Sequence, residues 1–247
     1  MKTKLKPILL IILFTSASLF AQVNIEEYRN STSGQLVKQK INLQTEIQRS
    51  KKSLYAIHIG YLKPLKMDFG LNGFLITKIN FGKSNGTEYL NNTFYHLRIF
   101  ENQPTKNIIP ESYIQYEKNK FSSTEERYLA GIGIRYKMNE FFIFGTSILN
   151  EWLKETITSS RTSTWRLSQY LQTTIQLNEI NRLNVIFYLQ PSLNDITNIR
   201  YYSESQFISK ITNQIAYTST LTAKFFSQST VYDDVELYFK SGLSFKI

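Results

Sequence analysis

The chain lacks cysteine and has only two histidines, His58 and His96, among its 247 residues. The missing cysteine excludes a disulfide scaffold, cysteine-based zinc sites and a catalytic thiol, and two histidines exclude a histidine-rich metal cluster. Ten glycines and five prolines argue against a fibrous or low-complexity protein. Since the sequence also has no glycine-rich phosphate loop, no metal-spaced ligand set and no dinucleotide motif, we expect no cofactor and no bound metal.

Long apolar runs are also missing after the N-terminus. Lys2, Lys4 and Lys6 precede the apolar run Ile8–Phe14, the small residues Ser16, Ala17 and Ser18 follow, and a candidate cleavage point lies after Ala21. This order is typical of a secretory signal peptide, and the run is shorter than the roughly 20 residues of a membrane-spanning helix. We therefore predict a signal peptide over residues 1–21 and an exported mature chain.

Acidic residues are fewer than basic ones, 19 against 29, which gives a formal charge of +10. Nucleic-acid binding is not expected, because the chain is exported and has neither a basic helix nor an aromatic ribonucleoprotein motif. A basic exported surface can instead meet anionic lipid headgroups or acidic solutes. Ordinary solvated loop charges are the alternative interpretation.

Alternation with a period of two, which predicts β-strands, recurs along the rest of the chain. Between residues 127 and 138 the even positions are Tyr128, Ala130, Ile132, Ile134, Tyr136 and Met138, and the odd ones are mostly polar or glycine. The same pattern predicts about twelve strands. They are Lys40–Arg49, Leu54–Leu62, Gly70–Phe81, Asn91–Phe100, Glu111–Phe121, Glu126–Met138, Phe141–Trp152, Ser163–Leu177, Arg182–Ser192, Asn198–Lys210, Gln214–Ser227 and Val231–Ile247.

The length of these segments favours a membrane barrel over a soluble sandwich. Strands of ten or more residues, tilted by about 40°, match the apolar band of an outer membrane, whereas sandwich strands are commonly shorter. Tyr128 and Tyr136 lie eight positions apart on one face, as two interfacial aromatic girdles require.

Turn lengths support the same choice. Met138–Glu140 and Asn178–Asn181 are minimal turns, whereas we expect longer loops at Gly82–Leu90 and Leu153–Thr162. Short periplasmic turns and longer outer loops are typical of such barrels. We predict an all-β fold, a transmembrane antiparallel up-and-down β-barrel over residues 40–247. It would lie in the outer membrane of a Gram-negative bacterium, with residues 22–39 as a periplasmic N-terminal segment.

The last predicted strand is strongly alternating. Its apolar positions are Val235, Leu237, Phe239, Leu243, Phe245 and Ile247, with Ser241 between them. The pattern resembles the C-terminal signal that the barrel assembly machinery reads, so we expect this machinery to be a partner. Outer-membrane lipid is the second expected partner.

Two runs of the chain, Glu111–Phe121 and Arg127–Lys137, resemble the centre of the domain of unknown function 481 family. The segments His96–Phe100, Arg166–Tyr170 and Gln190–Asp195 fit the same pattern. The resemblance covers roughly residues 41–247. It implies an outer-membrane β-barrel of the salt-induced-protein type and no established chemistry.

Charged and polar side chains on the inward face are the candidates for function, because charges facing hydrocarbon are costly. By parity, the lumen-lining candidates are His96, Arg98, Gln115, Glu117, Arg135, Glu151, Arg166, Arg200 and Glu204. Two interpretations stay open for them. They form either an ion-paired plug in a structural or stress-related barrel, or the lining of a narrow passive pore for a small solute.

An enzyme acting on lipid is the third interpretation. Only His58 and His96 could serve as a conventional base, and parity places both away from the lipid face. Glu117 and Glu151 have arginines nearby, which favours ion pairing over acid–base chemistry. We therefore expect no enzymatic activity and no catalytic residues, and we expect a monomer.

Overall fold

A computed structural model describes residues 39–49, 53–101, 106–120, 124–156, 159–227 and 235–246 of the chain. The predicted signal peptide lies outside these residues, as does the segment 22–39 except for Gln39. Among the described residues, no helix is long and apolar enough to cross a membrane.

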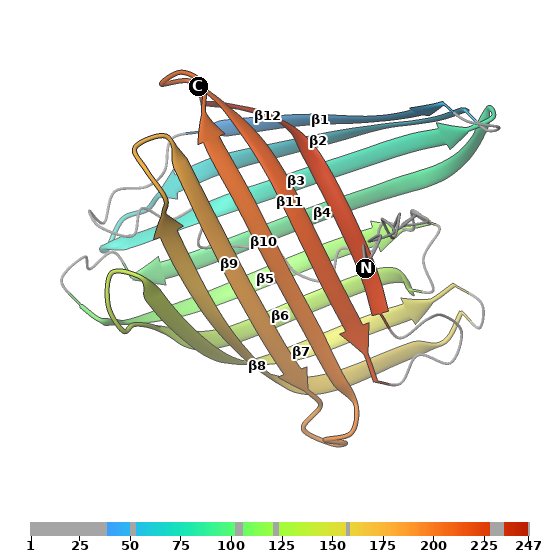
Figure 1. Cartoon of the computed structure of the whole chain (residues 1–247). Helices are drawn as coiled ribbons and strands as arrows, with labels where there is room; N and C mark the ends of the chain where they lie inside the picture. Colours follow the sequence, from blue (N-terminus) through green and yellow to red (C-terminus); the bar gives the residue numbers. More distant parts are fainter. Residues whose placement is uncertain are drawn as a thin grey trace, which may run out of the picture.

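Twelve antiparallel strands form one closed barrel, as predicted (Figure 1). Each strand pairs with its neighbours in sequence, and β1 closes the barrel against β12. The strands are β1 (Lys40–Arg49), β2 (Ser53–Lys66), β3 (Leu71–Ser84), β4 (Thr87–Glu101), β5 (Ile108–Asn119), β6 (Thr124–Lys137), β7 (Phe142–Glu155), β8 (Arg161–Gln176), β9 (Asn181–Pro191), β10 (Ile199–Lys210), β11 (Ile215–Phe226) and β12 (Val235–Lys246).

Side chains alternate between the interior and the outer face, as the period-two pattern requires. On β6, Arg127 and Leu129 are buried inside the barrel, whereas Ile132 is 71% exposed on the outer face. Tyr128 and Tyr136 are also exposed there, on either side of Ile132. The predicted parity of this strand is therefore confirmed.

Three of the turns at the end of the barrel that holds the chain termini share one design. In the turns after β6, β8 and β10, the side-chain oxygen of Asn139, Asn178 or Thr212 accepts two backbone N–H bonds from the residues two and three positions on. Asn and Thr favour such turns because their short side chains satisfy the backbone locally. The turns predicted at Met138–Glu140 and Asn178–Asn181 are short, as expected.

The long loop predicted at Gly82–Leu90 is wrong. Strand β3 continues to Ser84 and β4 begins at Thr87, so only Asn85 and Gly86 form the turn. Both have positive φ, 50° and 81°. An Asn-Gly pair adopts these angles readily, and the resulting two-residue turn matches the twist of the flanking strands. Polar residues that look like a loop are here the ends of two strands.

The loop predicted at Leu153–Thr162 is shorter than expected for the same reason. Leu153 pairs with Thr162 and Lys154 pairs with Arg161, so the hairpin continues beyond its apolar part. Polar strand ends are compatible with pairing here because the backbone, and not the side chains, forms the ladder.

Strand β2 extends to Lys66, beyond its predicted end at Leu62, although it contains Pro64. Its described pairing with β1 ends at Leu62, so Pro64 pairs only with Phe74 of β3. Proline is tolerated at such a position because no second strand requires its missing N–H group.

Candidate functional site: the barrel interior

The predicted lumen-lining residues all occupy inward positions of their strands. Arg200 is the most accessible of them, with 16% of its side chain exposed. The others are buried: His96, Arg98, Gln115, Glu117, Arg135, Glu151, Arg166 and Glu204. The interior is therefore densely filled by the side chains that alternation places there.

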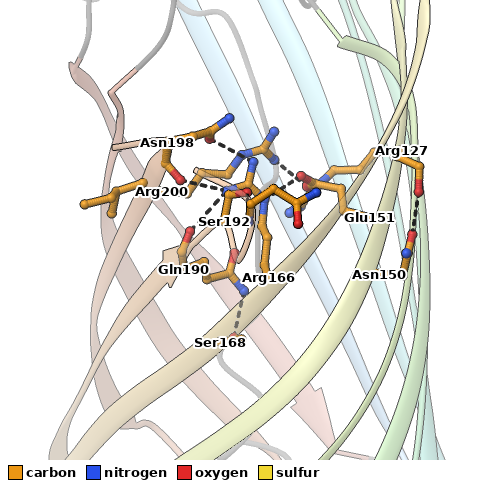
Figure 2. A network of polar contacts seen from close by, with 12 residues as sticks. Arg127, Asn150, Glu151, Arg166, Ser168, Gln190, Ser192, Asn198 and Arg200 are labelled. Carbon is orange, nitrogen blue, oxygen red and sulfur yellow. Dashed lines mark hydrogen bonds and ion pairs between the residues drawn. The ribbon is translucent and has the colours of Figure 1, made fainter. Parts of the chain in front are cut away.

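Glu151 on β7 binds three arginines (Figure 2). Its Oε1 atom lies 2.6 Å from Nε of Arg127 and 2.5 Å from Nη1 of Arg200, and its Oε2 lies 2.8 Å from Nε of Arg166. Glu117 approaches the same group, with 3.9 Å between its Oε2 and Nη1 of Arg127. We call these five residues the Glu151 cluster.

Burial makes this cluster energetically important. The Glu151 side chain is completely inaccessible, and those of Arg127 and Arg166 are nearly so. Ionised groups lose their hydration in such a place, and only close, hydrogen-bonded partners offset that cost. Since three guanidinium groups face two carboxylates, the cluster carries a net positive charge.

Arg166 also fastens the connection between β9 and β10. Its Nη1 donates to the carbonyl oxygens of Gln190 and Asn198, each at 3.2 Å, and its Nη2 donates to Oδ1 of Asn198 at 3.0 Å. The backbone N–H of Ser192 donates to the Asn198 carbonyl across the same turn. One guanidinium group therefore joins the Glu151 cluster to a loop at the end of the barrel opposite the termini.

A second ion pair joins β4 and β5, where Arg98 binds Glu111. The Arg98 guanidinium lies 4.4 Å from the ring centre of Tyr113. His96 stands between aromatic rings, 6.2 Å from Phe94 and 5.9 Å from Tyr113 by ring centres. The interior thus places the Arg98 guanidinium against an aromatic face as well as against a carboxylate.

Apolar side chains fill another part of the interior. One group comes from β2–β4 and one from β7–β10, and together they form a single apolar cluster: Leu62, Phe74, Ile76, Phe94, Ile143, Tyr170, Ile186, Tyr188 and Tyr202. The buried apolar residues of β5 and β6, Tyr113 and Leu129, belong to a separate cluster with Leu149. Contacts between the group from β2–β4 and the group from β7–β10 therefore run across the interior.

Gly145 makes room for one of these rings. A β-carbon at this position would lie 1.9 Å from Cε1 of Tyr170 on the neighbouring strand. The Tyr170 ring therefore occupies the space that any other residue at position 145 would fill.

Two residues of the site were missed among the sequence-based candidates, Arg127 and Glu111. Arg127 has the same inward parity as the candidate Arg135 on β6, and Glu111 has the same inward parity as the candidate Glu117 on β5. The alternation itself was therefore the signal that could have identified them. Their importance depends on close partners on other strands, which alternation does not reveal.

Both histidines point inside, as predicted. His58 Nδ1 lies 2.6 Å from Oδ1 of Asn80, whose amide group donates in turn to Asn92. In the described part of the chain, no group of three or more His, Asp or Glu residues could hold a metal ion. Glu117 and Glu151 are ion-paired with arginines, as the sequence indicated.

Comparisons with known proteins agree with the barrel fold described above. No protein-family model matches the sequence, and no curated protein is significantly similar to it. Among solved structures, the KdgM porin has a TM-score of 0.51 at 8% identity and covers 84% of this chain and 99% of its own. The NanC porin has a TM-score of 0.51 at 12% identity, covering 85% and 100%. The chain therefore has the outer-membrane β-barrel fold of these porins.

Proposed function

We propose that the protein is an outer-membrane channel for small anionic solutes, which the Glu151 cluster and the apolar cluster keep closed in the state described above. The observation that carries this proposal is the sign of the interior charge. Among the buried inward side chains of the described residues, together with the 16%-exposed Arg200, cations outnumber carboxylates: Lys40, Arg98, Arg127, Arg135, Arg166, Arg200 and Lys224 stand against Glu111, Glu117, Glu151 and Glu204. A positive interior attracts anions and repels cations along the same path.

One structural neighbour supports the choice of solute class. The KdgM porin is also solved in complex with disordered oligogalacturonate, at a TM-score of 0.50 and 8% identity to this chain. Galacturonate carries a carboxylate on each sugar. A comparable barrel therefore accepts an anionic solute, which is consistent with a basic interior here.

Opening requires side chains to move, and Arg200 is the residue best placed to do so. Two strands, β8 and β9, separate its strand from β7 in the wall, so it reaches Glu151 across the interior. It is also the most exposed member of the Glu151 cluster. Withdrawal of this one side chain would separate the two walls at that level without breaking backbone pairing.

Planar-bilayer recording of the purified, refolded protein tests the proposal. We expect the wild-type protein to open rarely, with a reversal potential in a KCl gradient that indicates anion preference. Arg200→Gln should open more often and with weaker anion preference, because it removes both the bridge and a cation. Lys106→Gln, which changes an exposed lysine that is ion-paired with Glu101 at the other end of the barrel, is the matched control.

Silence of both the wild-type protein and Arg200→Gln, with both shown to be folded by their anomalous migration on unheated gels, would contradict the channel. It would favour the second candidate, a structural barrel whose interior serves only stability. The dense filling of the interior supports this second candidate. Lipid hydrolysis by the folded protein would instead favour the enzyme.

We further propose that the chain is a monomer and belongs to the domain of unknown function 481 family. The motifs at Glu111–Phe121 and Arg127–Lys137 support this membership, and their alternation is that of β5 and β6. We also propose that the N-terminal signal directs export and that the barrel assembly machinery recognises the last strand.

A further inference from the structure

A row of aromatic side chains crosses the outer face of β4–β7. Tyr95 pairs with Tyr116, Tyr116 with Tyr128 and Tyr128 with Trp152, so the four stand side by side. The rings of Tyr95 and Tyr116 are 6.3 Å apart by their centres, and those of Tyr116 and Tyr128 are 4.7 Å apart. Aromatic rows on the lipid face of a barrel mark the level where hydrocarbon meets headgroups.

Charged side chains form the next row, two residues further toward the end opposite the termini. Lys118 pairs with Glu126, Glu126 with Lys154 and Lys154 with Arg161. These positions have the outward parity of the aromatic row and lie about 5 Å beyond it along the barrel axis. Cations that face lipid at this depth lie among the headgroups, because hydrocarbon would exclude them.

The charges of this row are only partly compensated. Lys118 lies 3.3 Å from Glu126, and Lys154 lies 2.6 Å from Glu125. The side chain of Lys118 is still 49% exposed. No carboxylate of the described residues forms an ion pair with Arg161, which is exposed beside Lys154. The row therefore offers a net positive charge and a guanidinium with free donors.

The wall formed by β9–β11 provides the contrast. Its outward aromatic group consists of Phe187, Tyr201 and Phe225. Two residues further toward the end opposite the termini, the outward positions are Leu189, after Phe187, and Ile199, before Tyr201. Both are uncharged. Outward aromatic side chains thus lie on both walls, whereas the row of cations next to them lies on β5–β8.

We propose that Lys118, Lys154 and Arg161 bind the phosphate groups of an anionic lipid headgroup on the outer face of β5–β8. The aromatic row below them would pack against the acyl chains of the same lipid. Guanidinium and ammonium groups suit phosphate because several N–H donors can meet its oxygens. Glu125 and Glu126 hold the two lysines within the row, and Arg161 contributes the uncompensated charge. This site is on the outer face, so it does not depend on whether the interior conducts.

Native mass spectrometry of the detergent-solubilised full chain tests the site with diphosphoryl lipid A, monophosphoryl lipid A and phosphatidylcholine as probes. We expect retention to follow the number of phosphate groups and to fall as ionic strength rises. The triple variant Lys118→Gln, Lys154→Gln and Arg161→Gln should weaken diphosphoryl lipid binding by at least about tenfold. Arg161→Gln alone should weaken it less, and it breaks no described ion pair.

Lys63→Gln is the matched control, because Lys63 is exposed on the outer face of β2 near the opposite end of the barrel. An equal loss of lipid in Lys63→Gln would overturn the site and indicate nonspecific attraction by net charge. Competition by inorganic phosphate at the same concentration as the lipid would overturn the lipid assignment and indicate a soluble-anion site. Unchanged binding by the folded triple variant would overturn the proposal altogether.

Discussion

Arg200 of β10 and Glu151 of β7 meet inside the barrel, although β8 and β9 separate their strands in the wall. Their contact is therefore a link across the interior and not a pairing of neighbouring strands. Arg127 and Arg166 approach the same carboxylate from β6 and β8. A single glutamate thus ties together four strands.

Loss of the Glu151 charge should destabilise the barrel. Glu151→Gln leaves three buried guanidinium groups without their shared carboxylate, and breaking a buried ion pair in this way costs about 3–5 kcal/mol. Urea titration of folding into lipid vesicles measures the effect, with Trp152 and Trp165 on the outer face as fluorescent reporters. Glu140→Gln, in the exposed turn after β6, should change stability by less than about 0.5 kcal/mol. Equal stability of the two variants would contradict the assigned role.

Space at Gly145 gives a second prediction. Gly145→Ala places a β-carbon 1.9 Å from Cε1 of Tyr170, so the ring must move within a filled interior, at a cost of about 1–3 kcal/mol. Gly60→Ala is the matched control, since its β-carbon would meet only atoms of Asn42, the nearest of them Cβ at 3.4 Å. The same urea titration compares them. A neutral Gly145→Ala would mean that the interior tolerates a displaced Tyr170.

Depth in the membrane can be read from two positions on the outer face of β6 and the following turn. Ile132→Arg places a charge between the two tyrosine levels and should cost about 2–4 kcal/mol, because lipid offers no hydration there. Met138→Arg, in the turn beyond Tyr136, should cost about 1 kcal/mol or less. Folding yield into vesicles distinguishes the two. If both variants fold equally well, the outer face of β6 does not cross hydrocarbon.

The loop between β9 and β10 should depend on the shape of the Arg166 side chain and not only on its charge. Arg166→Lys keeps the charge but cannot donate to Glu151 and to both acceptors of Asn198 at once. We expect faster amide hydrogen exchange at residues 193–197, with the strands unchanged. Arg161→Lys, on the outer face of the same strand, serves as the control. Unchanged exchange in Arg166→Lys would show that other contacts hold the loop.

Alternation in the sequence predicted the class of fold and the side of the barrel on which residues lie. Parity is a local property, because successive side chains of a strand point to opposite faces whatever the strand pairs with. Tyr128, Ile132 and Arg135 could therefore be placed on the outer or inner face from their own neighbours alone.

Contacts across the interior could not be predicted in this way. The meeting of Arg200 with Glu151, or of Phe74 with the far apolar group, depends on the register of several strand pairs and on closure. Strand ends were also misplaced where their side chains are polar, as at Asn85–Gly86. There the backbone ladder continues beyond the apolar pattern, and only the turn conformation ends it.

The pairing of β1 with β12 differs from every other pairing of the barrel because its two strands lie at opposite ends of the barrel sequence. The remaining pairs join strands that follow one another, so the sheet can grow hairpin by hairpin from local contacts. Closure instead brings together the two ends of nearly the whole barrel sequence, at an entropic cost roughly 3–4 kcal/mol above that of a short hairpin. Until that step, β1 and β12 are open edges that can pair with a strand of another protein. The folding stage most open to incorrect strand pairing is therefore the curved, unclosed sheet, in which β1 and β12 have not yet paired.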